Sequence, residues 1–295
     1  MEAQLPERTV LCFIDGHNDT SIWDTLRLGE GDVLVNTYGK SGTTWMQQIC
    51  RQIYAKGVES TENIHLKSPW VEMKLSRAKV ESLASDPSIP HKIFKSHAPL
   101  TAIHYQPHVK YIHVVRECKD ALVSYHNHLQ AFQPDARELL EQPAQETTLS
   151  ELIQMWLVDG KPLWPYFDHV KSWWQYRHLP NILILHYQDL LDDLEGNVRR
   201  VAAFLEQDLI DDEIKNVVHQ SSFAYMKQNE AMFQPSDAIL VPGHFINKGT
   251  NKRWKDLMTS EEVQAFENAY ATHFSPELIE FVKYGSKGPS PPIAC

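Results

Sequence analysis

The chain has 295 residues, in which 28 Lys and Arg stand against 38 Asp and Glu, so its formal charge is -10. Hydrophobic residues make up 42% of the chain and charged residues 22%, a composition typical of globular proteins and unlike that of disordered or collagen-like chains. The negative balance argues against sequence-independent binding to nucleic acid or to an anionic membrane surface, because both kinds of binding depend on Lys and Arg.

The cysteines and the hydropathy pattern indicate the compartment. The four cysteines form no C-x-x-C pair, so we expect reduced thiols and neither a disulfide framework nor a zinc module. No apolar run approaches the roughly 18 residues of a membrane span, and the first ten residues include Glu2, Glu7 and Arg8, which is not a signal-peptide pattern. We therefore expect a cytoplasmic protein.

Short apolar segments alternate with helical patterns along the chain. Four of them predict strands, at residues 32–38, 91–96, 110–116 and 181–187. Helices are predicted at residues 43–56, 119–131, 149–157, 166–177, 189–205 and 261–272. This alternation predicts a single α/β domain with a central, mainly parallel sheet flanked by helices. The domain is expected to span residues 1–284, and the Gly/Pro/Ser-rich residues 285–295 to form a flexible tail.

The first predicted strand leads into a turn that suits an anion. The turn reads Gly39-Lys40-Ser41-Gly42-Thr43-Thr44-Trp45 and opens a predicted helix. Backbone N–H groups, hydroxyls and a lysine at a helix start predict a P-loop-like phosphate-binding strand-loop-helix, although a solvent-exposed turn is an alternative. Leu34 stands where the Walker A pattern needs its first glycine, which disfavours a nucleoside triphosphatase or kinase.

Two further segments carry basic residues after predicted strands or in a loop. Arg116 ends the third strand and Ser124 lies eight residues on, which suits a second anion site. Residues 247–255 hold four cations, Lys248, Lys252, Arg253 and Lys255, together with Gly249. A solvated charged face would explain this segment, and so would a flap over a bound nucleotide.

These motifs resemble the cytosolic sulfotransferases, which use 3′-phosphoadenosine 5′-phosphosulfate (PAPS) as sulfuryl donor. Residues 37–45 are similar to that family's T-Y-P-K-S-G-T-T-W, with Gly39 in place of Pro, and residues 116–124 to its R-x-x-K-D-x-x-V-S. Residues 95–97 look like its K-[ST]-H strand end, and residues 245–255 like its R-K-G-x-x-G-D-W-K. The resemblance covers roughly residues 20–275.

The resemblance implies a role for each matching residue. His97 would be the general base, Lys40 would meet the bridging oxygen of the leaving phosphate, Lys95 would stabilise the transferring group, and Ser124 would contact the 3′-phosphate and restrain Lys40. An unperturbed imidazole titrates near 6.5, which suits His97 as a base. No metal is implied. The implied nucleotide-binding residues are Lys40, Ser41, Gly42, Thr43, Thr44, Trp45, Arg116, Ser124, Tyr187, Ser221, Phe223, Asn247, Lys248 and Gly249.

The sequence also departs from the family's pattern. Asn247 replaces an Arg at the start of the C-terminal motif, and either Lys252 or Arg253 would have to take over its contact with phosphate. The family's dimerisation pattern is only half met, by Lys255 and Thr259. The sequence therefore does not decide between a monomer and a dimer.

The acceptor pocket is expected to form from residues 12–19, 66–72 and 131–148. Because these segments contain Asp15, Asp19 and Glu72, we hypothesise a polar or cationic small-molecule acceptor, sulfated on a hydroxyl or an amine. A noncatalytic protein that binds 3′-phosphoadenosine 5′-phosphate (PAP) is an alternative function, and a P-loop-type small-molecule kinase is a less favoured one.

Overall fold

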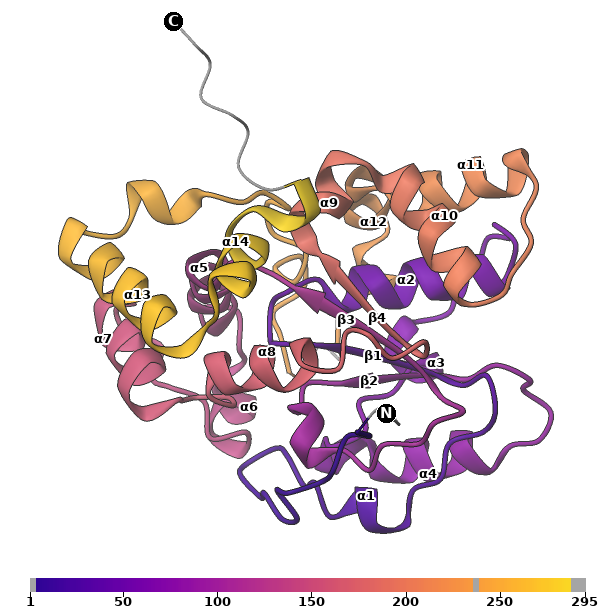
Figure 1. Cartoon of the computed structure of the whole chain (residues 1–295), viewed down its shortest axis with the longest axis horizontal. Helices are drawn as coiled ribbons and strands as arrows, with labels where there is room; N and C mark the ends of the chain where they lie inside the picture. Colours follow the sequence, from indigo (N-terminus) through magenta and orange to yellow (C-terminus); the bar gives the residue numbers. More distant parts are fainter. Residues whose placement is uncertain (1–3, 236–238, 288–295) are drawn as a thin grey trace, which may run out of the picture.

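A four-stranded, fully parallel sheet lies at the centre of the molecule (Figure 1). The computed structural model describes residues 4–235 and 239–287. The strands follow the order β2-β1-β3-β4 across the sheet, and their bounds are β1 Val33–Thr37, β2 Ile93–Ser96, β3 Lys110–Val115 and β4 Ile182–His186. The prediction of a mainly parallel α/β sheet is confirmed, and each predicted strand is present and shorter by one or two residues in total.

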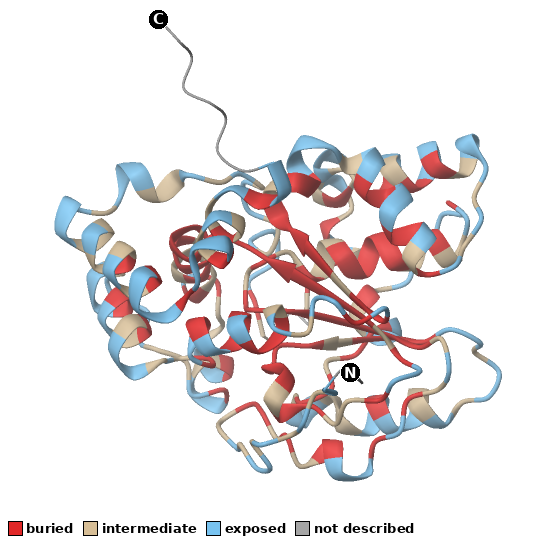
Figure 2. Cartoon of the chain, in the orientation of Figure 1, coloured by how far each residue is buried: buried red, intermediate tan, exposed pale blue. Residues whose placement is uncertain are grey.

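Both faces of the sheet are covered by helices, and the strands are therefore buried along almost their whole length (Figure 2). Side chains alternate between the faces of a strand: Val33 and Val35 belong to one apolar cluster, whereas Leu34 belongs to another. The first face is packed by α2 Thr43–Tyr54, α10 Leu194–Phe204 and α11 Asp211–Gln220. The second is packed by α5 Cys118–Leu129, α8 Tyr166–Trp174, α13 Ser260–His273 and α14 Pro276–Tyr284.

Shorter helices fill the connections. They are α1 Ile22–Thr25, α3 Ile64–Lys67, α4 Arg77–Ser85, α6 Pro134–Leu139, α7 Leu149–Gln154, α9 Tyr187–Asp192 and α12 Phe223–Gln228. A π-helical segment, Met155–Asp159, follows α7, and the 3₁₀ turns η5 Arg253–Asp256 and η6 Gly285–Lys287 lie near the C-terminus. No helix within residues 4–235 or 239–287 is long and apolar enough to cross a membrane.

Two predicted boundaries were wrong. The helix expected at residues 189–205 is two helices, because Asp193 leaves the helical conformation (φ -152°, ψ 79°) and its carboxylate caps α10 by accepting the Gly196 N–H at 2.9 Å. The start of the expected tail is packed: the Ser286 N–H donates to both carboxylate oxygens of Asp189, at 3.1 and 3.0 Å. Residues 288–295, the rest of that expected tail, lie outside the described residues.

The strand order determines where a ligand can bind. The chain passes from β1 to β2 on one side and then returns to place β3 on the other side of β1. In open parallel sheets such a reversal leaves a crevice beyond the carboxyl ends of the two central strands. Here these ends lead into the predicted phosphate loop after β1 and into Arg116 after β3.

Candidate active site

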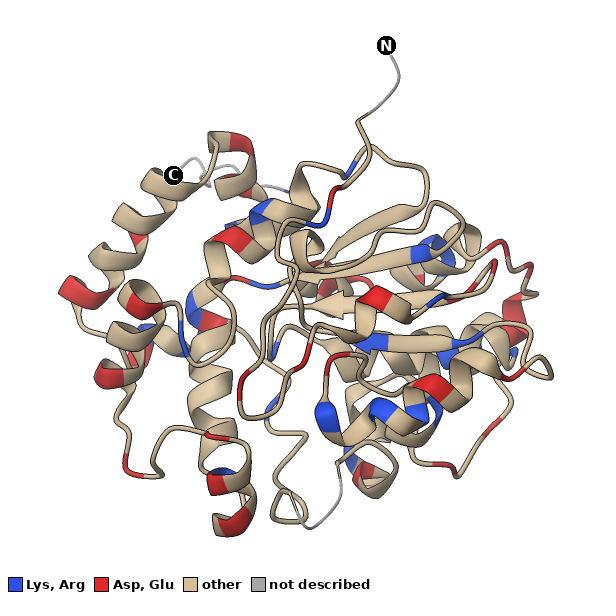
Figure 3. Ribbon diagram, turned by 90° about the horizontal axis from the view of Figure 1, so that it is seen from below, with Lys and Arg blue, Asp and Glu red and all other residues tan. Residues whose placement is uncertain are grey.

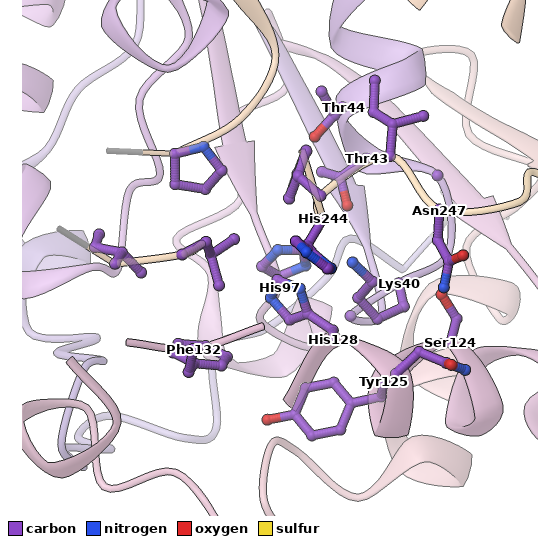
Figure 4. Close-up of a pocket in the computed structure, with 18 of the residues that line it drawn as sticks. Lys40, Thr43, Thr44, His97, Ser124, Tyr125, His128, Phe132, His244 and Asn247 are labelled. Carbon is purple, nitrogen blue, oxygen red and sulfur yellow. The ribbon is translucent and has the colours of Figure 1, made fainter. Parts of the chain in front are cut away.

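A cavity of about 1010 Å³ opens at the carboxyl edge of the sheet. This is the upper end of the roughly 300–1,000 Å³ typical of ligand pockets, so the cavity has room for a donor and an acceptor together. Most of the predicted site residues line it: Lys40, Gly42, Thr43, Thr44, Trp45, Lys95, His97, Arg116, Ser124, Tyr187, Phe223, Asn247, Lys248 and Gly249. Figure 4 shows several of these side chains converging from different elements.

The structure does not place Ser41 or Ser221 on the cavity wall. Both side chains are fully buried, and their hydroxyl oxygens have no hydrogen-bond partner among the described residues. The Ser221 carbonyl instead accepts the indole N–H of Trp45 at 2.7 Å, which orients the Trp45 ring. In this structure neither hydroxyl is exposed to the cavity, and the assignment of these two serines to nucleotide binding stays a prediction.

The phosphate loop has a tight backbone that its glycines permit. Gly42 adopts φ +100°, and a Cβ there would lie 2.9 Å from the ring of Tyr187. A Cβ at Gly39 would lie 2.4 Å from Leu163 Cδ1, so Leu163 occupies the space that a larger residue would need. Lys40 itself has φ +65°, a conformation that costs energy outside glycine and is concentrated at functional sites.

His97 is fixed by a hydrogen bond to the first strand. Its Nδ1 lies 2.8 Å from the Thr37 carbonyl oxygen, and since a carbonyl only accepts, Nδ1 must carry the proton and donate it. The unprotonated Nε2 then keeps its lone pair. Burial and the nearby Lys95 hold the pKa of His97 well below its ordinary value, so the imidazole is neutral at physiological pH and a weaker base than a free histidine, contrary to the expected titration near 6.5.

Two lysines flank this imidazole without a carboxylate partner among the described residues. The Lys95 Nζ lies 4.8 Å from the centre of the Trp70 ring, and the Lys40 Nζ lies 5.1 Å from that of Phe245. Burial, together with Lys95 and Arg116, lowers the pKa of Lys40 to about 7, and burial lowers that of Lys95 to about 8. An anion would relieve the repulsion between these cations.

Ser124 begins the lower wall of the cavity on α5, beneath Asn247 (Figure 4). Both side chains lie near the phosphate loop, but within the described chain the Ser124 hydroxyl has no hydrogen bond to Lys40. The expected restraint of Lys40 by Ser124 is therefore absent from this structure. Lys40 is held instead through its carbonyl oxygen, which accepts from Arg116 Nη1 at 2.8 Å.

Arg116 also connects the third strand to the C-terminal basic segment. Its Nε donates to Asn251 Oδ1 at 2.9 Å and its Nη2 to the Thr250 carbonyl at 3.1 Å, while its guanidinium stacks 4.3 Å from the centre of the Tyr187 ring. These contacts use three of the five guanidinium N–H groups. Two remain for a phosphate in the cavity.

The geometry distinguishes the two candidates for the missing family arginine. Arg253 lines the cavity, is half-buried, and has no ion pair or hydrogen bond from its side chain within the described chain. Lys252 is exposed and does not line it; its backbone N–H donates to Asp120 Oδ1 at 2.6 Å. Arg253 is thus the cation that is free to replace the family's arginine.

Two aromatic residues, Trp45 and Phe223, line the cavity beside this segment. Gly249 (φ +62°) packs directly on Phe223, and a Cβ at Gly249 would lie 2.4 Å from the Phe223 ring. Trp45 and Phe223 both line the cavity, and Phe223 is 43% exposed, which is unusual for a large apolar ring and leaves its face available for stacking.

The three carboxylates on which the cationic-acceptor hypothesis rested, Asp15, Asp19 and Glu72, do not line the cavity. Glu72 is buried and accepts hydrogen bonds from Trp23, Trp70 and Ser96 at 2.9, 3.0 and 2.7 Å. Asp19 pairs with Arg77 at 3.0 Å, and Asp15 accepts the backbone N–H groups of residues 17 and 18. The structural basis of the cationic-acceptor hypothesis was therefore wrong, because these acids stabilise the loops.

The acceptor end of the cavity is mainly apolar instead. In Figure 4 Phe132 lies on the opposite side of His97 from Thr44. The apolar lining residues in this region are Met73, Leu75, Phe132, Leu139, Leu140, Ile239 and Leu240. The only carboxylates that line the cavity within the described chain are Asp120 and the exposed Asp135. Acidic residues are spread over outer helices and loops of the molecule (Figure 3), so the net charge of -10 leaves the cavity basic.

Sequence reasoning missed several lining residues, among them His128 and Phe245, which both lie near Lys40. His128 is one helical turn beyond Ser124 on α5, and that spacing was the signal that could have revealed it. Phe245 sits under Lys40 and carried no such signal. Within residues 4–235 and 239–287 no group of His, Cys, Asp and Glu side chains has the arrangement of a metal site.

Comparison with known proteins agrees with this geometry. The family described as "Sulfotransferase domain" matches residues 30–278. Sulfotransferase 1 family member D1 of Mus musculus is 29% identical over 264 residues, 85% of each chain, and the 3-alpha-hydroxysteroid sulfotransferase of Cavia porcellus is 30% identical over 262 residues, 84% of this chain and 85% of that one.

A solved structure has the same fold. Retinol dehydratase in complex with retinol and PAP superimposes with a TM-score of 0.72 at 23% identity, covering 86% of this chain and 83% of that one. The match to the family extends over most of the chain and includes the sheet, the phosphate loop and the C-terminal basic segment. The predicted family and enzyme class are confirmed: this chain belongs to the sulfotransferases.

Proposed function

We propose that this enzyme transfers the sulfuryl group of PAPS to a hydroxyl group on a small molecule with an apolar body, with His97 as general base. The observation that carries the proposal is the convergence of Lys40, Lys95 and the free Nε2 of His97 on one wall of the cavity. Two desolvated ammonium groups beside a neutral imidazole suit a reaction in which a proton leaves one oxygen while negative charge builds on another.

The nucleotide end of the cavity fits PAPS. Arg116, Arg253 and Lys248 supply cations on the cavity wall, and Trp45 and Phe223 supply ring faces for a base. Gly249 permits close approach of the backbone at this end. PAPS supplies the sulfuryl group and a stable leaving group, PAP.

The protein's part in the transfer follows from its geometry. His97 accepts the acceptor's proton at Nε2, and the Thr37 carbonyl stabilises the resulting imidazolium through Nδ1–H. Lys40 stabilises the negative charge that develops on the departing phosphate oxygen. This interaction is stronger in the transition state than in the ground state, so it accelerates the reaction. Lys95, whose ammonium group lies over the Trp70 ring, stabilises the sulfuryl group during its transfer. In-line displacement then has the acceptor oxygen at His97 and the leaving phosphate oxygen at Lys40, with the sulfur between them.

The acceptor is proposed to be largely apolar with a hydroxyl at one end. The acceptor end of the cavity is walled by Phe132, Leu140 and Leu240, among others. The solved structure of retinol dehydratase holds retinol, and one relative is named as a hydroxysteroid sulfotransferase. Retinol and hydroxysteroids are both largely apolar alcohols, which supports the same class of acceptor here.

A radiolabelled PAPS assay tests the proposal against its alternatives. The enzyme is incubated with pooled apolar alcohols, phenols and amines, with and without EDTA, and sulfated product is counted. We expect labelled products from alcohols or phenols, unaffected by EDTA. PAP binding without any transfer would support the noncatalytic alternative, whereas activity only with ATP and magnesium would support the kinase.

Arg253→Ala is expected to raise the PAP dissociation constant by roughly 10- to 100-fold, the loss of one charge-assisted contact with phosphate. Lys252→Ala is the matched control, because Lys252 is adjacent and equally charged but lies off the cavity. Titration calorimetry with PAP measures both. A larger loss in Lys252→Ala than in Arg253→Ala would assign the phosphate contact to Lys252.

PAP affinity is expected to fall as the pH rises above 7. With a pKa of about 7, Lys40 is half neutral at that pH in the free protein, whereas phosphate favours its charged form. Binding must therefore take up a proton at higher pH, and the dissociation constant should rise toward tenfold per pH unit above roughly pH 8. Calorimetry in buffers of different ionisation enthalpy measures the uptake. A constant affinity between pH 7 and 9 would contradict the lowered pKa.

A further inference from the structure

Five histidines line the cavity: His17, His65, His97, His128 and His244. Three of them are tied to a backbone carbonyl oxygen, at 3.3 Å for His17, 2.8 Å for His65 and 2.8 Å for His97. His244 is exposed. His128 differs from all of these, because it is half-buried and has no hydrogen-bond partner within the described chain.

The ring of His128 stands beside the reacting groups. Figure 4 shows it next to His97 and close to the Lys40 ammonium, although the three residues come from different elements. Phe132 and Phe245 pack on it edge-to-face, with ring centres 5.1 and 6.0 Å away. An acceptor whose hydroxyl is bound at His97 therefore lies near His128.

The two ring nitrogens of His128 have different surroundings. Nδ1 is completely buried and has no hydrogen-bond partner among the described residues, whereas Nε2 is not among the buried atoms that lack a partner. A buried N–H without an acceptor is rarer and more costly than a buried lone pair without a donor. The favoured tautomer thus carries its proton on Nε2 and presents an N–H donor to the cavity. Burial and the neighbouring Lys40 hold the pKa of His128 well below its ordinary value, so the ring stays neutral.

The imidazoles of His97 and His128 then present one hydrogen-bond acceptor and one donor to the cavity. His97 presents a lone pair at Nε2, and His128 presents an N–H. On the basis of the function proposed above, we propose that His128 selects acceptors that carry a second oxygen on the atom next to the one that is sulfated. His97 accepts the proton of the reacting hydroxyl, while His128 donates a hydrogen bond to the adjacent hydroxyl, ether or carbonyl oxygen.

Three acceptors with one apolar body provide the test: 2-naphthol, 3-methoxy-2-naphthol and 2,3-dihydroxynaphthalene. The methoxy compound matters most, because its second oxygen can only accept. In the wild type we expect kcat/KM for 3-methoxy-2-naphthol to exceed that for 2-naphthol about tenfold, the usual size of one such hydrogen bond. His128→Phe keeps a ring against Phe132 and Phe245 and should abolish this ratio.

His126→Phe is the matched control, since His126 lies on the same helix, off the cavity, with Nε2 3.1 Å from the Thr147 carbonyl. It should leave the ratio unchanged. If the wild type does not prefer the methoxy compound, or if His128→Phe keeps the preference, the proposal is overturned. Calorimetric binding of both naphthols to the PAP complex gives the same ratio without turnover, so a protein that binds selectively but transfers no sulfate would refute the proposed function and not the role of His128.

Discussion

His97→Gln is expected to lower kcat for sulfuryl transfer by about 10²- to 10⁴-fold, the usual contribution of a positioned general base, while PAP still binds. The glutamine side chain keeps an amide N–H within reach of the Thr37 carbonyl but has no basic lone pair at the position of the imidazole Nε2. The loss should therefore fall on kcat measured at saturating PAPS. His97→Ala should lose at least as much, because it also breaks the bond to Thr37.

His126 provides a control for the His97 variants. His126→Gln changes a histidine off the cavity and should retain normal turnover. PAP affinity, measured by calorimetry, reports whether the cavity remains intact in each variant. Near-normal turnover in both His97 variants would remove His97 from the mechanism, and a parallel loss of PAP affinity would make its role structural.

The fold was predictable because its strongest signals are local. Each buried strand is a short apolar run, and each is followed by the polar or small residues of a ligand edge. The phosphate loop was found for the same reason: Gly42 needs φ +100° and precedes a helix start. Helix α4 was missed because its periodic apolar pattern is weak, whereas α11 was missed although its buried Ile214 and Val217 recur at helical spacing.

What the sequence could not reveal is the direction in which a side chain points. Ser41 lies within the predicted loop, yet its hydroxyl faces the interior. Glu72 was expected to face the acceptor, but it accepts two indole N–H groups and a hydroxyl inside the protein. Composition counts such acids as surface charge, and only the packing around them shows that they are already paired.

The same reasoning explains why Lys252 and Arg253 could not be separated from the sequence. Neighbouring residues in a loop have no fixed periodicity, so neither position predicts a direction. In the structure Lys252 adopts φ +68° and donates its backbone N–H to the Asp120 carboxylate. Lys252 is the N-cap of η5, and Arg253 is the first residue of that turn. That turn brings Arg253 to the cavity wall.

Lys40→Met is expected to lower kcat by about 10²- to 10³-fold at saturating PAPS, the usual cost of removing one preorganised group that stabilises developing negative charge. Methionine has a similar length and can still pack on Phe245, so the main change is the loss of the ammonium group. Lys171→Met is the control, because Lys171 is exposed and, in the part of the chain that the structure describes, forms an ion pair only with Asp168, at 3.2 Å. Normal turnover in Lys40→Met would exclude a role for Lys40 in the transition state.

The same variant tests whether catalysis and pH dependence have one origin. If the group with a pKa of about 7 is Lys40, Lys40→Met must also remove the rise of the PAP dissociation constant near pH 7. Lys95, whose pKa is lowered to about 8, would leave a weaker dependence that begins about one pH unit higher. If Lys40→Met lowers kcat but leaves the pH dependence of PAP binding unchanged, catalysis and pH dependence have different origins. The titrating ammonium would then be that of Lys95, because Lys95 is the other cation beside His97 with a pKa in this range.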